Sequence, residues 1–209
     1  MGRAIGPKCK LCRSSGEKLF LKGSRCHSDK CAMERRPYSP GQHGRSRGRK
    51  LSNYGVQLKA KQKAKKIYCV LEKQFRKYFD KADRQRGVTG TNLLCLLERR
   101  MDMVVYRMGC ALSRPHARQL VRHNFFTVNG KKVTIPSYQL KVGDVVEVNT
   151  KEARQAHVRA NLELTSSFKV PEWLSFEEGQ LKGSFVRFPE RDEMDQSIDE
   201  QLIVELYSK

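Results

Sequence analysis

The sequence has few acidic residues and no long apolar run. It contains 22 Asp and Glu against 42 Lys and Arg, which gives a formal net charge of +20 at pH 7. No apolar stretch approaches the roughly 20 residues that a membrane span needs, and the first ten residues lack the apolar core of a secretory signal. A charge of this size goes beyond what solubility requires. We therefore expect a cytoplasmic protein that does not enter membranes and that binds a polyanion.

The positive charge is concentrated towards the N-terminus. Residues 1–66 contain 19 Lys and Arg but only three acids, whereas residues 187–209 contain three Lys and Arg and seven acids. The first segment is therefore the cationic part of the molecule. The last segment is too short to be a domain, and it carries apolar side chains that a solvated tail would expose. We predict that it docks onto another surface.

Four of the seven cysteines form two close pairs, Cys9 with Cys12 and Cys26 with Cys31. An odd number of cysteines in a chain without a secretory signal argues against a disulfide framework. Two short chelating pairs are typical of structural zinc, so we predict one zinc ion, with His27 as the alternative ligand. An iron–sulfur cluster uses the same thiolates, and the spacing does not exclude it. The remaining cysteines, which are predicted to be core side chains, are Cys69, Cys95 and Cys110.

The segment 34–50 is predicted to be a basic arm. Its prolines and glycines interrupt any periodicity, and its arginines are spaced as in an arm that follows a nucleic-acid backbone. Ser52 is predicted to begin a helix in which Lys59, Lys63 and Lys66 share one face. Because the apolar face of this helix is poor, we expect it to lie against RNA.

Three further elements are predicted from local patterns. The segment Lys18 to Lys22 has the alternation of a strand. Apolar residues from Ile67 to Tyr78 recur at helical spacing and predict a core-facing helix. Leu93 to Met108 shows the same periodicity, which predicts one long helix that ends at Gly109 in a left-handed conformation.

The stretch that follows combines an arginine-bearing helix with a hairpin. Ser113 is predicted to cap the helix, with Pro115 in its first turn and Asn124 at its end. Its arginines recur every four residues, so they form a stripe that drifts about 80° around the axis. Asn129-Gly130 between strand-forming residues predicts a tight hairpin that carries two lysines. Together these elements predict a rigid cationic surface that suits RNA.

The remaining elements predict a small antiparallel sheet. Phe126–Val128, Lys132–Ile135 and Val142–Val148 are its expected strands, residues 151–163 form a helix, and short strands follow near Trp173 and Gly183. The predicted fold is α+β, with a helical domain that carries an N-terminal zinc module and a basic arm, and a small RNA-binding domain of helices on the sheet. The predicted domains are 1–50 for the zinc module and arm, 51–98 completed by 190–209 for the helical domain, and 99–189 for the RNA-binding domain, with its core module at 99–162.

Two motifs point to a known family. SRPHARQLVRHNFFTVNGKKV, residues 113–133, resembles the RNA-binding module first named from small-subunit ribosomal protein four. RRPYSPGQHG (35–44) and SNYGVQLKAKQKAKKIY (52–68) resemble the bacterial type of that ribosomal family itself, and the similarity extends from about Gly2 to Lys209.

This resemblance implies a structural constituent of the small ribosomal subunit, a primary binder of 16S-type rRNA and a scaffold for subunit assembly. It also implies a place where messenger RNA enters the ribosome, and a contact with ribosomal protein five that affects translational accuracy.

An RNA-modifying enzyme or a regulatory RNA-binding protein that carries the same module is the alternative. Arg100-Met101-Asp102 is similar to the Arg-Leu-Asp stretch of pseudouridine synthases, but it falls inside a predicted helix and no paired acid and base accompany it. A zinc-containing DNA-binding regulator lacks a recognition helix between its ligands. We therefore predict a protein that is not an enzyme.

The predicted site residues fall into two groups. The metal ligands are Cys9, Cys12, Cys26 and Cys31. The cations predicted to bind RNA lie on the N-terminal arm, the lysine-rich helix, the arginine stripe and the hairpin: Arg3, Arg35, Arg36, Arg45, Arg47, Arg49, Lys50, Lys59, Lys63, Lys66, Arg114, Arg118, Arg122, Lys131 and Lys132.

Overall fold

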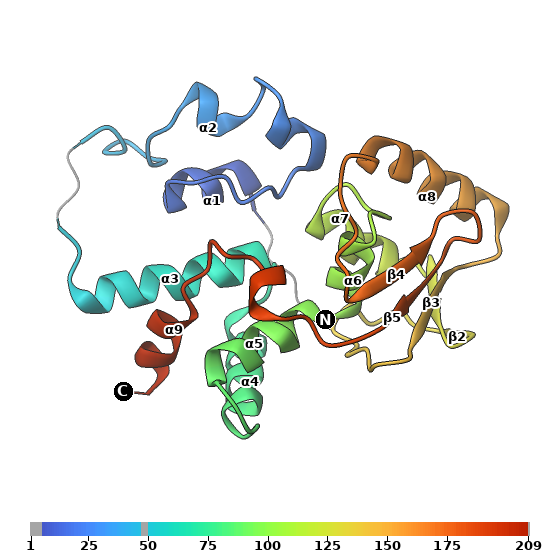
Figure 1. Ribbon diagram of the computed structural model, residues 1–209. Helices are drawn as coiled ribbons and strands as arrows, with labels where there is room; N and C mark the ends of the chain where they lie inside the picture. The colour runs from blue at the N-terminus through green and yellow to red at the C-terminus, as the bar shows by residue number, and fades with distance from the viewer. Residues whose placement is uncertain (1–5, 47–49, 209) are drawn as a thin grey trace. The chain divides into compact units, whose positions relative to one another are not determined.

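The chain forms two compact units, which the computed structural model describes over residues 6–46 and 50–208. The helical unit comprises Met1–Leu94 and Asp195–Lys209, and the sheet unit comprises Cys95–Met194. Helices combine with an antiparallel sheet, so the fold is α+β, as predicted (Figure 1). Within the described ranges, no helix combines the length and apolar character that crossing a bilayer requires.

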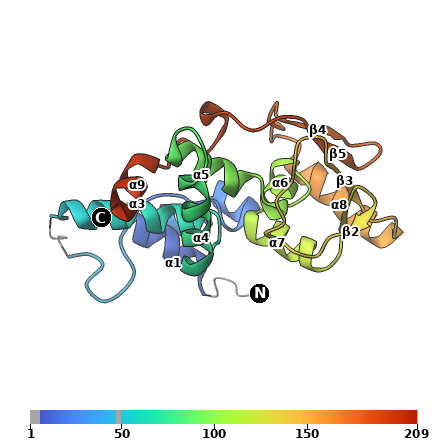
Figure 2. The same cartoon turned by 90° about the horizontal axis from the view of Figure 1, so that it is seen from below.

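The helical unit is organised around one long helix. Its elements are α1 (Lys8–Ser15), the 3₁₀ turn η1 (Gly23–His27), α2 (Ala32–Arg35), α3 (Asn53–Ile67), α4 (Glu72–Asp83), the first part of α5 (Thr89–Glu98) and α9 (Glu200–Tyr207). Ser52 caps α3 as predicted, because its Oγ accepts a hydrogen bond from the Gly55 N–H at 3.3 Å. Both α1 and α9 contact α3, and α9 lies beside α3 in both views (Figure 1, Figure 2).

The C-terminal segment docks onto the helical unit through α9. The ring of Tyr207 stacks on Phe79 with centroids 4.5 Å apart, and its hydroxyl donates to Glu72 Oε1 at 2.9 Å. Gln57 Nε2 donates to Glu205 Oε2 at 2.9 Å. These contacts join residues more than 120 positions apart in the chain, and they confirm the prediction that the tail docks.

The sheet unit packs helices against a five-stranded antiparallel sheet. Its elements are α6 (Met101–Arg107), α7 (Arg114–Arg122), β1 (Phe126–Val128), β2 (Lys131–Lys132), β3 (Val145–Val148), α8 (Glu152–Thr165), β4 (Leu174–Glu177), β5 (Lys182–Phe185) and the 3₁₀ turn η2 (Arg191–Glu193). The strand order is β2-β1-β3-β5-β4. The helix predicted at 151–163 and the strands predicted near Trp173 and Gly183 are therefore present, within a few residues of their expected bounds.

The core of the sheet unit lies between the sheet and its helices. Phe126 pairs with Val148 and Val128 with Val146, so the buried residues of β1 and β3 share one face of the sheet. Ala117, Leu120 and Val121 of α7 belong to the same hydrophobic cluster, as do residues of α6. This apolar contact fixes the orientation of α7 relative to the sheet.

A left-handed residue interrupts two of the predicted patterns, so the predicted strand is wrong, and the predicted core-facing helix is confirmed only from α4 (Glu72–Asp83) onward, where Phe75 and Tyr78 are buried. The segment 18–22 is not a strand: Leu19 and Leu21 are buried, but Phe20 between them has φ 50° and turns the chain. The apolar stripe that begins at Ile67 is not continuous, because α3 ends there and Cys69 has φ 53°. The N–H groups of residues 69 and 70 bond to the carbonyls of residues 66 and 65, which closes α3 with a Schellman motif.

The long helix predicted up to Met108 is also wrong, because the chain breaks it into α5 and α6. Arg100 has an extended conformation (φ −69°, ψ 140°) and forms an antiparallel bridge with Gln139. The N–H of Met101 then donates to Tyr138 O at 2.9 Å. Pairing with a loop that lies some 40 residues further along therefore overrides a continuous helical periodicity.

The first prediction concerns the close packing of β5 on β4 and α6. A Cβ atom at Gly183 would lie 2.6 Å from Met108 Cε and 2.8 Å from Ser175 O, and the second of these is backbone of β4. We expect Gly183→Ala to destabilise the protein by about 1–3 kcal/mol, as overpacking does. The matched control is Gly179→Ala, where nothing lies within 4 Å of the added atom. Urea unfolding of both variants checks this, and equal midpoints would contradict it.

The second prediction concerns the contact that holds α9. Burial would raise the pKa of the Glu72 carboxyl, but hydrogen bonds from Lys65, Lys61 and Tyr207 outweigh burial and lower the pKa from 4.5 to about 2. A carboxyl with a depressed folded-state pKa stabilises the fold above its unfolded pKa, and this contribution is lost as pH falls towards the folded value. We expect the melting temperature of the wild-type protein to fall more steeply than that of Glu72→Gln between about pH 4.5 and pH 2. A constant difference between the two melting curves over that interval would refute the prediction.

Candidate nucleic-acid interface and metal centre

The helix α7 is positioned by the local signals that its sequence predicts. Gly109, with φ 77°, follows α6, and Ser113 Oγ then accepts from the His116 N–H at 3.4 Å to cap α7. At the other end Asn124 has φ 62°, and the N–H groups of residues 124 and 125 bond to the carbonyls of residues 121 and 120. This is a second Schellman motif, and it turns the chain directly into β1.

The three arginines of the predicted stripe on α7 differ in their surroundings. Arg122 is exposed. Arg118 is only 12% exposed in its side chain and donates from Nη1 to Asp102 Oδ2 at 3.2 Å. Arg114 is buried, with its guanidinium carbon 5.0 Å from the centroid of the Tyr106 ring. Because the arginines drift around the helix axis, Arg114 and Arg118 lie at the contact between α7 and α6. Of the three, only Arg122 faces solvent.

The hairpin presents its two lysines as predicted. Lys131 and Lys132 form β2, pair with β1 and are both exposed. The turn between the strands has left-handed residues, Asn129 at φ 50° and Gly130 at φ 74°. The Asn129 side chain bonds to the β3 side of the sheet, since its Oδ1 accepts from the Val145 N–H at 2.8 Å. These cations therefore stand on a hairpin that is anchored to the sheet.

The lysine face predicted on α3 is largely engaged within the helical unit. Lys59 is exposed. Lys63 pairs with Glu17 at 2.7 Å and also donates to Ser197 O. Lys66 donates to Ser14 Oγ at 2.9 Å, and burial lowers the pKa of its ammonium group. This face therefore contacts α1 and the C-terminal segment through Lys63 and Lys66, and a contact of the helix with RNA stays a prediction.

The basic arm is held by an aromatic contact that the sequence pattern did not reveal. The guanidinium carbons of Arg13 and Arg45 each lie 4.8 Å from the centroid of the Tyr38 ring. Arg13 Nε also donates to Tyr38 O at 2.9 Å. No spacing rule links Arg13 to residues 25 positions away, so the sequence alone carried no signal for this contact.

The other cations predicted for the basic arm and the N-terminus fall into two groups. Exposed side chains are those of Arg35, Arg36, Arg45 and Lys50. The predicted RNA contacts Arg3, Arg47 and Arg49 lie outside the described residues.

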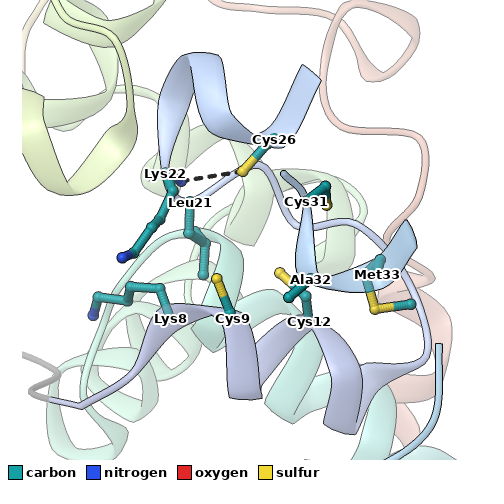
Figure 3. Close-up of a pocket in the computed structure, with 9 residues that line it drawn as sticks. All are labelled: Lys8, Cys9, Cys12, Leu21, Lys22, Cys26, Cys31, Ala32 and Met33. Carbon is teal, nitrogen blue, oxygen red and sulfur yellow. Dashed lines mark hydrogen bonds between the residues drawn. The ribbon is translucent and has the colours of Figure 1, made fainter. Parts of the chain in front are cut away.

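The four predicted metal ligands line one small cavity of about 10 Å³. Cys9 and Cys12 lie on α1, Cys26 lies in η1, and Cys31 immediately precedes α2. Figure 3 shows that the sulfur atoms of the four cysteines face this cavity. His27 does not line the cavity, and its ring stacks on Phe20 at a centroid distance of 5.1 Å. The structure therefore brings together the predicted cysteines and not the alternative ligand.

The electrostatics of the cysteine cluster are those of buried, neighbouring thiols. Burial raises the pKa of Cys12 and Cys26, and the nearby thiols raise it further. Backbone N–H groups act in the opposite direction, and that of Lys22 lies 3.4 Å from Cys26 Sγ. Such N–H donors stabilise thiolates.

Over residues 6–46 and 50–208, no three His, Cys, Asp or Glu side chains stand close enough to count as a formed metal centre.

The remaining cysteines and Asp102 have structural positions. Burial raises the pKa of Cys95, and it raises that of Cys110 to about 12, as is typical of inert core thiols. Asp102 is 3% exposed and bound by two arginines, so it lacks the open position that a catalytic carboxylate needs. The similarity of this triplet to pseudouridine synthases thus has no counterpart in the geometry.

Comparisons with known proteins cover the whole chain. The family model described as "Ribosomal protein S4/S9 N-terminal domain" matches residues 3–98, and the "S4 domain" model matches residues 99–146. The chain is 56% identical to the small ribosomal subunit protein uS4 of Geotalea daltonii and 55% identical to those of Thermodesulfovibrio yellowstonii and Nitrosospira multiformis. Each similarity spans 209 residues, which is 100% of both chains.

The third prediction tests which cations of the sheet unit contact RNA. We expect replacement of Arg122, Lys131 and Lys132 by Gln to reduce the log–log slope of RNA affinity against salt by roughly 0.7 to 0.9 per residue, or about two units in all. The matched control replaces three other exposed lysines of the same unit, Lys141, Lys151 and Lys169, and should change the slope less. Filter binding across a salt series measures both slopes, and equal changes would move the interface away from the hairpin.

Proposed function

Since this chain belongs to the ribosomal protein S4 family, we infer that it is a structural, non-enzymatic constituent of the small ribosomal subunit that binds the subunit's RNA. The observation that carries this conclusion is the identity of 55–56% to small ribosomal subunit proteins over the full length of both chains. The net charge of +20 agrees with it, because an RNA backbone is the polyanion that such a charge attracts.

The mechanism of binding is phosphate neutralisation combined with recognition of RNA shape. In the sheet unit, Arg122 and the hairpin lysines Lys131 and Lys132 supply exposed cations on anchored elements. In the helical unit, the arm and Lys59 supply others. Contacts of this kind fix the position of the RNA but carry little sequence information, so specificity comes from the fold of the RNA.

The family also suggests finer roles, which we propose for this chain. The protein binds small-subunit rRNA early, scaffolds assembly and lies near the path by which messenger RNA enters the ribosome. Its protein partner is ribosomal protein five, and this contact influences translational accuracy. Its location is the cytoplasmic ribosome. A scaffold role is supported by each unit taken by itself, because a preformed surface loses little conformational entropy on binding.

We propose zinc as a structural ion held by Cys9, Cys12, Cys26 and Cys31. Four thiols around one small cavity, with a backbone N–H directed at one sulfur, form a donor set that fits a soft, tetrahedral ion. When bound, the ion supplies a cross-link between α1 and the segment that leads into α2. The surrounding segment has few buried apolar side chains, chiefly Leu19 and Leu21, so a cross-link replaces part of a core.

The fourth prediction tests the function directly. We expect the wild-type protein to co-sediment with small ribosomal subunits in high salt, and to bind small-subunit rRNA in competition with an excess of duplex DNA. Loss of the protein from subunits at moderate salt would argue against a structural constituent. Equal competition by duplex DNA would favour a DNA-binding regulator.

The fifth prediction tests the metal. We expect close to one zinc per chain in protein purified without chelator, and loss of this zinc together with a lower melting temperature in Cys12→Ala and Cys26→Ala. The control replaces Cys69, Cys95 and Cys110 by Ala and should retain the zinc. Iron with visible absorption would identify an iron–sulfur cluster instead, and a metal-free wild-type protein would refute the site.

A further inference from the structure

Asp102 lies at the contact between α6 and α7 and binds two arginines, Arg100 just before α6 and Arg118 on α7. Its side chain is 4% exposed. Oδ1 accepts from Arg100 Nε at 2.9 Å and Oδ2 accepts from Arg100 Nη2 at 2.6 Å, which is a bidentate pair. The same Oδ2 accepts from Arg118 Nη1 at 3.2 Å. One buried carboxylate therefore joins the start of α6 to the middle of α7.

The backbone around this carboxylate is itself fixed. The N–H of Asp102 donates to Pro136 O at 3.2 Å, and that of Met101 donates to Tyr138 O at 2.9 Å. Arg100 pairs with Gln139 in an isolated bridge. The position of the carboxylate is thus set by the loop that precedes β3, and not by the helix periodicity alone.

We propose that Asp102 is a positioning residue for RNA binding. Its carboxylate fixes the guanidinium of Arg118, and through Arg118 it fixes the α7 face that ends at the exposed Arg122. This inference rests on the proposed binding of rRNA by the sheet unit. Its physical basis is preorganisation: a helix face that the contact between Asp102 and Arg118 already holds in one position loses less conformational freedom when RNA binds.

Simple electrostatics predicts the opposite effect of removing this charge. Asp102→Asn raises the net charge by one beside an RNA-binding helix, and Coulomb's law then favours tighter binding of phosphate. A positioning role predicts weaker binding despite the added charge. The sign of the change in affinity therefore separates the two explanations.

The chain offers a matched control in Glu98. Its side chain is fully buried and accepts a bidentate pair from Arg107, with Nε to Oε2 at 2.9 Å and Nη2 to Oε1 at 2.7 Å. Glu98→Gln makes the same change of charge and breaks a similar ion pair, but its partner lies on α6 and not on α7. Effects on general stability should therefore be common to both variants, and effects on α7 should be specific to Asp102.

The experiment measures the affinity of the full-length protein for transcribed small-subunit rRNA, its salt dependence and the melting temperature. We expect Asp102→Asn to weaken RNA binding about tenfold, a loss within the range for neighbours that act in one network. The salt slope should stay unchanged. Glu98→Gln should bind as the wild-type protein does, even where its melting temperature falls equally. In the double variant with Arg118→Gln, Asp102→Asn should cause no further loss.

Three results would overturn the proposal. They are equal or tighter binding by Asp102→Asn, an equal loss in Glu98→Gln, and losses that multiply in the double variant. If Asp102→Asn does not fold, Arg118→Lys tests the same contact with the charge retained, since an ammonium cannot reproduce the guanidinium geometry. It should weaken binding about threefold, and wild-type affinity would refute the role. Failure of the wild-type protein to bind the rRNA would instead refute the proposed function.

Discussion

Because acidic side chains are scarce in this chain, their positions decide which cations become part of the fold and which remain at the surface. A buried cation is tolerated only when it is paired and hydrogen-bonded. Asp102 pairs with Arg100 and Arg118, and Glu98 pairs with Arg107. In the helical unit Glu72 contacts two lysines and Tyr207, and so ties α3, α4 and α9 together. Each acid thereby converts repulsion between neighbouring cations into a specific contact.

Internal contacts also orient α7 and the hairpin that follows it. The apolar face of α7 sets its orientation on the sheet, while the ion pair with Asp102 fixes the rotation of one of its arginines. The hairpin lysines are fixed by a different means, since Asn129 bonds the turn to β3. Both devices produce a rigid cationic surface. Exposed cations on anchored elements suit the RNA binding that we propose for this surface.

The N-terminal segment lacks a large apolar core. Few of its side chains are apolar and buried, and four thiols occupy the place where a core would be. The zinc ion that we propose would provide in one set of bonds what many apolar contacts provide elsewhere. The contact of Arg13 and Arg45 with Tyr38 then joins α1 to the part of the arm at 38–45.

The sequence by itself determined the features that depend on neighbouring residues. The caps at Ser52 and Ser113, the left-handed ends at Gly109 and Asn124, and the Asn-Gly hairpin follow from the side chains within one turn of each site. The motifs also predicted the ribosomal family.

Only the tertiary structure decided the break at Arg100, the engagement of two predicted RNA-binding lysines within the helical unit and the burial of Arg114. Each depends on a partner outside the local pattern: Gln139, Glu17 with Ser14, and Tyr106. Periodicity places a side chain on a face of a helix, but the element that packs against that face determines whether the side chain meets solvent, an acid or an aromatic ring.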